Sequence, residues 1–319
     1  MSTNKKDLAE RCVVYKNMVR ELTPELAKIA KEELNENPKQ ILNDLNQIKE
    51  WISKQHHLKA RTDDQWLLAL LRGCKFSLEK VKVKIDFYYS LRSSAPEITL
   101  RLKPTQPEFL DFIRIGTIVI LPKPKTGLNP RMILIRPGMY DPQVNSVADV
   151  MCALYYLVQI LLMEDDTSTI LGTKVLVDYE GVTMTHLTQA NPSLLRKMIL
   201  VGQDSLPLRL RGSHHFNLPT GIEIIFTLIS GFLNEKAKQR LRIHKNVDDI
   251  LEFVPKEILP TEYGGDGGSL REILDHWVSK IVEYKTWMQQ EEQFGSDESR
   301  RIKISSDEVV GSFRSLDID

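Results

Sequence analysis

Residues 173–217 read TKVLVDYEGVTMTHLTQANPSLLRKMILVGQDSLPLRLRGSHHFN, and this stretch decides the fold. It begins with an apolar run that ends in a loop, continues with a segment opened by Pro192, and closes with a second run, residues 207–217. Proline suits the first turn of a helix, and short apolar runs are typical of buried strands. Two strands separated by a helix indicate a parallel β-α-β unit.

The flanking segments extend this alternation. Residues 116–138 contain two runs rich in Ile, Val and Leu around a Pro/Gly/Asn turn, and an apolar helix is predicted over residues 147–164. After the opening stretch come predicted helices at residues 220–233 and 234–240 and a short strand at 241–246. Strands that alternate with helices predict an α/β fold with a mostly parallel sheet.

The first part of the chain has a different pattern. Residues 1–60 are rich in Lys and Glu with helical spacing, followed by a helix to about Arg72, a break at Gly73 and a second helix from Ser77. We therefore predict a helical N-terminal region over residues 1–95, an α/β domain over 96–285 and a polar C-terminal tail over 286–319.

Composition excludes several classes of protein. Lys+Arg and Asp+Glu both number 43 in 319 residues, so nothing global indicates a nucleic-acid partner. Three scattered cysteines form no CxxC pair, which favours a reducing compartment and no metal site. The N-terminus lacks the apolar core of a secretory signal. We expect a soluble, cytoplasmic protein.

Catalytic motifs are missing from the sequence. We find no nucleophile elbow, P-loop, GxGxxG turn or HExxH helix, and the Gly-rich residues 263–269 lack the P-loop lysine. Asp178 ends a predicted strand with His186 eight residues later, but no activated Ser or Cys accompanies them. We predict no enzymatic activity and no cofactor.

Residues 207–217 hold four basic side chains. His214 and His215 point to opposite faces of a strand, so they are not expected to bind one metal ion. Arg209 and Arg211 share a face, and Lys236 and Arg240 share a face of the following basic helix. If the two pairs converge, a multiply charged phosphate is their natural ligand; a solvated surface is the alternative.

Between these pairs lies an apolar helix. Residues 218–232 read LPTGIEIIFTLISGF, with a broad apolar stripe and a single Glu. The stripe is typical of a buried core helix, and equally of a helix that closes an apolar cavity and swings away about Pro219, Gly221 or Gly231.

Six segments in this order resemble the CRAL-TRIO (Sec14-like) lipid-binding family, in the branch of α-tocopherol transfer protein and cellular retinaldehyde-binding protein. They are LLALLRGCKFSLEKV and PEI, then KVLVDYEG, NPSLLRKMILVGQDSLPLRLRGSHHFNLP, FLNEKAKQRLRIHKN and EILPTEYGG. The resemblance covers residues 40–285. It implies an N-terminal helical region and a CRAL-TRIO domain whose sheet floors an apolar pocket beneath a mobile gate helix, here residues 220–233.

The resemblance also implies residue roles. Arg209, Arg211, Lys236 and Arg240 fall on positions that bind a phosphoinositide head group. The implied pocket lining is Met151, Leu154, Tyr155, Val158, Val177, Met198, Leu206, Leu208, Ile225, Phe226 and Ile229. These roles predict a monomer at the membrane periphery that carries a tocopherol-, retinoid- or carotenoid-like lipid between membranes. The alternative is a lipid-responsive sensor or adaptor that regulates a protein partner.

Two departures from the family pattern limit what the resemblance implies. The N-terminal motif reads Leu71, Arg72, Gly73 and Cys74 where the family has LRAR, so a basic contact from the second arginine is not carried over. Leu154 and Val158 replace serines that approach the ligand's polar end in the tocopherol-binding member. The ligand is therefore expected to be more uniformly apolar, or anchored by Tyr155, Tyr156 or Thr173.

Overall fold

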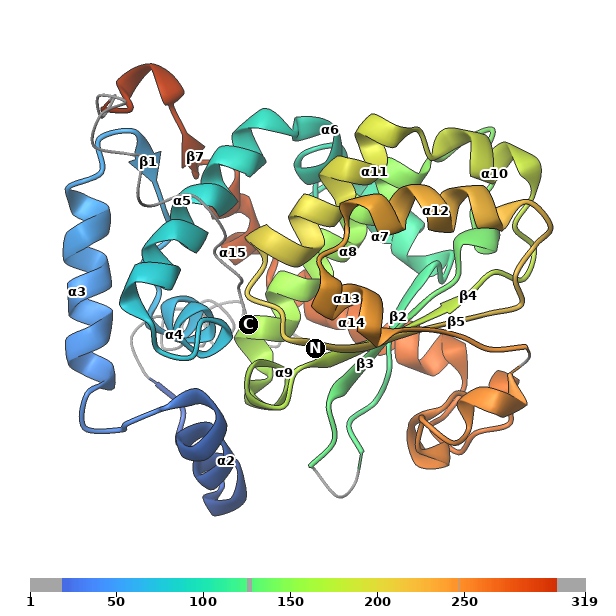
Figure 1. The fold of residues 1–319 in the computed structure, drawn as a ribbon, viewed down its shortest axis with the longest axis horizontal. Coiled ribbons are helices and arrows are strands. Elements are labelled where there is room, and N and C mark those ends of the chain that lie inside the picture. Colours follow the sequence, from blue (N-terminus) through green and yellow to red (C-terminus); the bar gives the residue numbers. More distant parts are fainter. Residues whose placement is uncertain (1–18, 125–127, 246, 303–319) are drawn as a thin grey trace, which may run out of the picture.

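The computed structural model describes residues 19–124, 128–245 and 247–302. Figure 1 shows a group of N-terminal helices beside a region built around a sheet. The helices before the sheet are α2 (Pro24–Leu34), α3 (Ile41–Ser53), α4 (Asp64–Gly73), α5 (Leu78–Ser94), α6 (Pro96–Thr99) and α7 (Pro107–Arg114). Thr23 and Ser77 cap α2 and α5 through their side-chain oxygens. The predicted break at Gly73 is confirmed.

A five-stranded sheet forms the centre of the molecule, in the order β2-β3-β4-β5-β6. The strands are β2 (Ile118–Ile120), β3 (Arg131–Ile135), β4 (Thr173–Asp178), β5 (Leu210–Phe216) and β6 (Leu241–Ile243). β2 runs antiparallel to β3, and the other neighbours are parallel. The predicted α/β fold with a mostly parallel sheet is confirmed.

Helices and short turns cover the sheet. The helices are α8 (Val147–Glu164), α9 (Asp166–Ile170), α10 (Met184–Gln189), α11 (Pro192–Ile199), α12 (Ile222–Phe232), α13 (Glu235–Arg240), α14 (Leu270–Glu283) and α15 (Lys285–Glu291). Figure 1 shows α11 and α12 on one side of the sheet and the turns after β6 on the other. A small second sheet pairs β1 (Leu58–Lys59) with β7 (Gly295–Ser296).

Helix α8 is the central core helix. Ser146 and Asp149 form a capping box at its start, which fixes the predicted N-terminus. By length and composition alone α8 is able to cross a membrane, but 83% of it is buried inside the protein. Such burial is what a core helix of a globular domain shows.

Buried ion pairs attach the helical region to the sheet-bearing region. The fully buried Arg72 of α4 donates to Glu36 at 2.8 Å and to Asp166 of α9 at 2.6 Å. A β-carbon on Gly73 would lie 2.8 Å from the carbonyl oxygen of Pro207, so glycine lets α4 end against the segment that leads into β5. The N-terminal helices thus fix the start of β5.

The described end of the chain packs on the N-terminal helices. Arg92 of α5 donates to the backbone oxygens of Glu291 and Phe294, at 2.7 and 3.1 Å. The divisions at residues 95 and 285 stay predictions, and residues 303–319 of the proposed tail lie outside the described residues.

Candidate functional site

Strand β5 carries different chemistry on its two faces. His215 lies 5.1 Å, ring to ring, from Phe226 of α12, whereas His214 stacks on His244 at 5.1 Å beneath the turns after β6. The predicted separation of the two histidines is confirmed. Arg211 lies four residues before His215 on β5, at the point where the register of this strand against β4 shifts by one residue.

Arg209 and Arg211 meet at one end of this strand. The Arg211 Nε donates to the backbone oxygen of Leu171 at 2.8 Å, and Arg209 donates to that of Ile170. Gly172, at φ 90°, makes this possible, because a β-carbon there would lie 2.3 Å from the Arg209 oxygen and 2.9 Å from the Arg211 side chain. Both guanidinium groups are therefore held by backbone acceptors.

Helix α13 brings further positive charge to the same place. It packs on β5, and Asn234 caps it by accepting from the Ala237 N–H. Burial and the nearby charge of Arg211 lower the pKa of Arg240. The pKa of Arg209 is also lowered, by burial and by the charges of Arg211 and Arg240, although its contact with the Glu33 carboxylate acts in the opposite direction. The three arginines are thus brought together.

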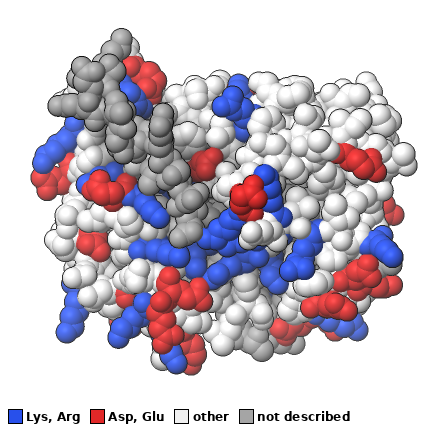
Figure 2. All heavy atoms as spheres, in the orientation of Figure 1, with Lys and Arg blue, Asp and Glu red and all other residues white. Residues whose placement is uncertain are grey.

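We call Arg209, Arg211, Lys236 and Arg240 the basic cluster. Lys236 lies one helical turn before Arg240 on α13, and its side chain is half-buried. Figure 2 shows Lys and Arg side chains forming a broad field over α13 and the nearby end of the sheet. Three arginines brought together, with Lys236 one helical turn from Arg240, favour a ligand with several negative charges.

Glu33 of α2 occupies this cluster. Its carboxylate lies 2.6 Å from Arg211 Nη2 and 3.1 Å from Arg209 Nη2, and hydrogen bonds to Arg211 and Arg209 lower its pKa despite some burial. Sequence analysis missed Glu33, because 176 residues separate it from Arg209 and no local pattern connects them. A small apolar contact of Ala30 and Leu34 with Ile170 and Leu171 holds α2 there.

Helix α12 keeps most of its apolar surface out of the core. Its sequence, IEIIFTLISGF, has one charged residue, yet Ile222 is its only fully buried side chain. None of the α12 side chains, all of which are described, packs on the main core; the helix lies along α11, and Phe226 reaches Tyr179 and His215. Ile224 is 68% exposed. Such a surface is unusual for a simple core helix.

The predicted pocket residues fall into two groups. Half-buried side chains are Met151 and Leu154 on α8, Met198 on α11, Leu208 before β5, and Ile225, Phe226 and Ile229 on α12. Buried side chains are Tyr155, Val158, Val177 and Leu206. Val177 pairs in register with His215, so it lies on the sheet face that looks toward α12.

Comparison with known proteins decides the family. The CRAL/TRIO domain model matches residues 121–265, and the model described as "Pinta-like, UBA domain" matches residues 37–109. The human protein named "Alpha-tocopherol transfer protein-like" is 31% identical over 78% of this chain and 72% of its own length. The chain belongs to the CRAL-TRIO family. The predicted membership of this family is confirmed. Members of the family bind and transfer lipids.

Other CRAL-TRIO relatives are similar over most of their length. Clavesin-1 of Xenopus laevis is 28% identical over 76% of this chain and 74% of its own. The rat protein named "Clavesin-2" is 27% identical over 82% of each chain. A solved structure titled "Crystal structure of Sfh5" aligns with a TM-score of 0.45 at 15% identity, over 77% of this chain and 89% of that chain.

Tyr155, which was predicted to line the pocket, packs against the N-terminal helices. Its hydroxyl donates to that of Tyr88 at 2.5 Å and accepts from Arg92 at 3.2 Å, and its ring stacks on Tyr88 of α5. The Tyr155 hydroxyl therefore joins α8 to the N-terminal helices. Its place in the pocket lining stays a prediction, because helical spacing does not say which neighbour a buried face contacts.

A chain of polar groups lies on the α12 side of the sheet instead. The Nδ1 of His215 lies 3.0 Å from the Tyr179 hydroxyl, and its Nε2 lies 2.7 Å from the Ser213 hydroxyl. A neutral imidazole carries one N–H hydrogen, and the two hydroxyls carry one hydrogen each. Two of these three hydrogens form the two hydrogen bonds, so one hydroxyl hydrogen remains for an outside acceptor. Asp178 and His186, the weak catalytic candidates, bond to separate partners, Tyr263 and Tyr140.

Both strand histidines are expected to stay neutral in the folded protein. Burial, then neighbouring positive charge, lowers the pKa of His214 and of His215 to about 4. The unfolded chain, with histidine pKa values of about 6.5, binds more protons below that pH. The free energy of unfolding should therefore fall as the pH drops from about 6.5 toward 4.

Imidazole resonances followed by NMR check this prediction. The signals of His214 and His215 should not titrate between about pH 8 and about pH 5, where an ordinary histidine gains its proton. A midpoint near 6.5 for either residue in the folded protein would contradict the assigned burial.

Proposed function

We propose that this CRAL-TRIO protein holds one apolar lipid beneath α12, without chemical turnover, and exchanges it at membranes whose phosphoinositide head groups bind the basic cluster. The observation that carries the proposal is the apolar surface of α12 that the core leaves unpacked. The lipid is tocopherol-, retinoid- or carotenoid-like, because the lining is apolar with one polar chain at His215.

The energetics favour a bound lipid. Covering ~500 Å² of apolar ligand surface contributes on the order of 12 kcal/mol before the entropic cost of binding. A single hydroxyl or carbonyl at the end of the lipid has the chain of Tyr179, His215 and Ser213 as a hydrogen-bonding partner. A lipid held this strongly leaves readily only to another apolar phase, which a membrane supplies.

Movement of α12 is the proposed gate. Only two residues separate α12 from α13, so a displacement of α12 is transmitted to the helix that carries Lys236 and Arg240. Exposed Met184 and Ile224 lie on α10 and α12, and Gly221, just before α12, lies near the Met184 sulfur. An exposed apolar edge on the helix that leads into the basic α13 suits the surface of an anionic membrane.

Removing charge from the basic cluster should separate membrane recognition from lipid capture. The double variant Arg211→Gln with Arg240→Gln removes two cations that bind phosphate oxygens, so affinity for vesicles with phosphatidylinositol bisphosphate should fall about 100-fold. Retinol serves as the probe, because its fluorescence reports both capture and transfer between vesicles. We expect unchanged capture and slowed transfer.

The matched control is Arg196→Gln with Lys238→Gln. This double variant also removes two positive charges, but from outside the basic cluster. Arg196 is exposed on α11, and Lys238 on α13 pairs with Glu235 at 2.6 Å. Its transfer rate should stay at the wild-type value. Equal transfer by both double variants would contradict phosphoinositide recognition at the cluster.

Glu33 competes with a phosphate for the same arginines, so Glu33→Gln should tighten head-group binding. A head group must displace two partly exposed ion pairs of Glu33, each worth about 0.5 kcal/mol. Without them, affinity for vesicles with phosphatidylinositol bisphosphate should rise about fivefold. Glu32→Gln, one residue earlier on α2 and exposed, is the control and should change nothing. Weaker binding by Glu33→Gln would mean that this carboxylate organises the cluster instead of competing for it.

A further inference from the structure

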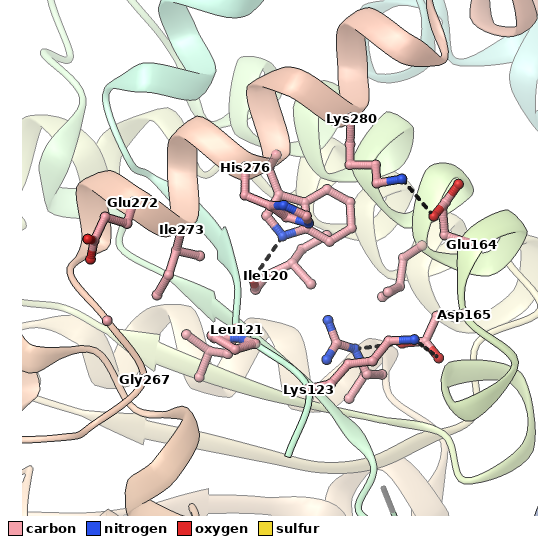
Figure 3. Close-up of a pocket in the computed structure, with 15 residues that line it drawn as sticks. Ile120, Leu121, Lys123, Glu164, Asp165, Gly267, Glu272, Ile273, His276 and Lys280 are labelled. Atoms are coloured by element: carbon pink, nitrogen blue, oxygen red, sulfur yellow. Dashed lines mark hydrogen bonds and ion pairs between the residues drawn. The ribbon is translucent and has the colours of Figure 1, made fainter. Parts of the chain in front are cut away.

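A cavity lies at the β2 edge of the sheet. It has a volume of about 610 Å³ and is bounded by β2 with the residues after it, the C-terminal end of α8, and α14. This volume is within the range of small-molecule sites. Figure 3 shows Ile120, Leu121 and Ile273 toward one end, and two ion pairs, Lys280 with Glu164 and Lys123 with Asp165, at the other.

One wall of this edge cavity is apolar and fixed. The Trp277 Nε1 donates to the backbone oxygen of Ile120 at 3.0 Å, which holds the indole of α14 against the edge strand. Ile120, Leu121, Leu161 and Ile273 complete the wall. An alkyl or aromatic group placed here leaves water for an apolar surface that is already formed.

The charged end holds equal numbers of cations and carboxylates, with Lys123, Arg131 and Lys280 against Asp165, Glu164 and Glu283. Asp165 faces two cations, Lys123 at 3.3 Å and Arg131 at 2.9 Å, and the side chains of Asp165 and Arg131 are only 3% and 5% exposed. Lys280 adds little, because Glu164 and Glu283 both pair with it at 3.0 Å. Asp165 is one carboxylate shared by two cations, so the positive charge at this end is concentrated at Lys123 and Arg131.

Arg131 also lacks an acceptor. Among the described residues its buried Nη1 has no hydrogen-bond partner, and its contact with Asp165 is an ion pair without hydrogen-bond geometry. Burial lowers the pKa of Arg131, against the effect of Asp165. A buried donor without an acceptor is costly, and a charged acceptor in the adjoining cavity removes that cost.

We propose that the edge cavity binds a small amphiphilic carboxylate of the fatty-acid class. The alkyl body lies against Trp277 and Ile273, and the carboxylate accepts from Arg131 and Lys123. This site is separate from the space beneath α12 and does not depend on the function proposed for it.

Contact quenching of tryptophan locates the ligand. The probe is ω-bromoundecanoate, whose bromine quenches an indole that it touches, and the wild-type protein should lose part of its fluorescence on titration. In Trp277→Phe the saturable quenching should disappear while calorimetry still detects binding. Quenching that persists unchanged in Trp277→Phe would place the probe elsewhere and overturn the proposal.

The head-group contact is tested with lysine variants. Lys123→Met should raise the dissociation constant of ω-bromoundecanoate about tenfold, because it removes one charge-assisted contact. Lys256→Met is the matched control, because the two lysines have similar surroundings. Lys256 is 66% exposed and pairs with Asp266, and Lys123 is 60% exposed and pairs with Asp165. The neutral ω-bromoundecanol should bind both variants and the wild type equally weakly. Equal effects of the two lysine variants, or tight binding of the alcohol, would overturn the proposal.

Discussion

The apolar surface of α12 that the core leaves unpacked is the constraint on which the rest of the molecule depends. The helix lies along α11, and its Phe226 reaches His215 of the sheet. Such a surface is costly in water, so the helix is stable in place only when something apolar covers it. In the proposed transfer cycle, a bound lipid covers this surface in solution and a membrane covers it during exchange.

Strand β5 links the two halves of that cycle. It carries Arg211 at the basic cluster and His215 beneath α12, four residues apart on one element. Gly172 and Gly73 position this strand by permitting close approach of Arg209 and Pro207. Head-group recognition and lipid anchoring are thus proposed to share one strand, with α12 and α13 following it in the chain.

Glu33 adds a third participant from outside the CRAL-TRIO domain match. Its carboxylate stands where a phosphate is proposed to bind, and α2 is held there by a small apolar contact of its own. The ion pairs are partly exposed and therefore weak, so a head group with several charges is able to replace them. Binding at the membrane would then release α2 from the cluster.

Local patterns predicted the elements well, and tertiary pairings poorly. The bounds of α8, the start of α11 at Pro192 and the two faces of β5 follow from periodicity and capping, which are local. Glu33 with Arg211, Tyr155 with Tyr88, and Arg131 with Asp165 join residues far apart in the chain. No spacing rule connects such residues, so the competing carboxylate and the edge cavity became visible only in three dimensions.

Native mass spectrometry of the chain, purified without detergent, tests the central claim most directly. If the apolar surface beneath α12 is covered by a lipid, the intact protein should appear above its 36.7 kDa polypeptide mass by the mass of one small apolar molecule. Collisional activation should release that molecule and identify it. A polypeptide mass alone, under conditions that retain bound lipid in a known carrier, would contradict lipid binding beneath α12.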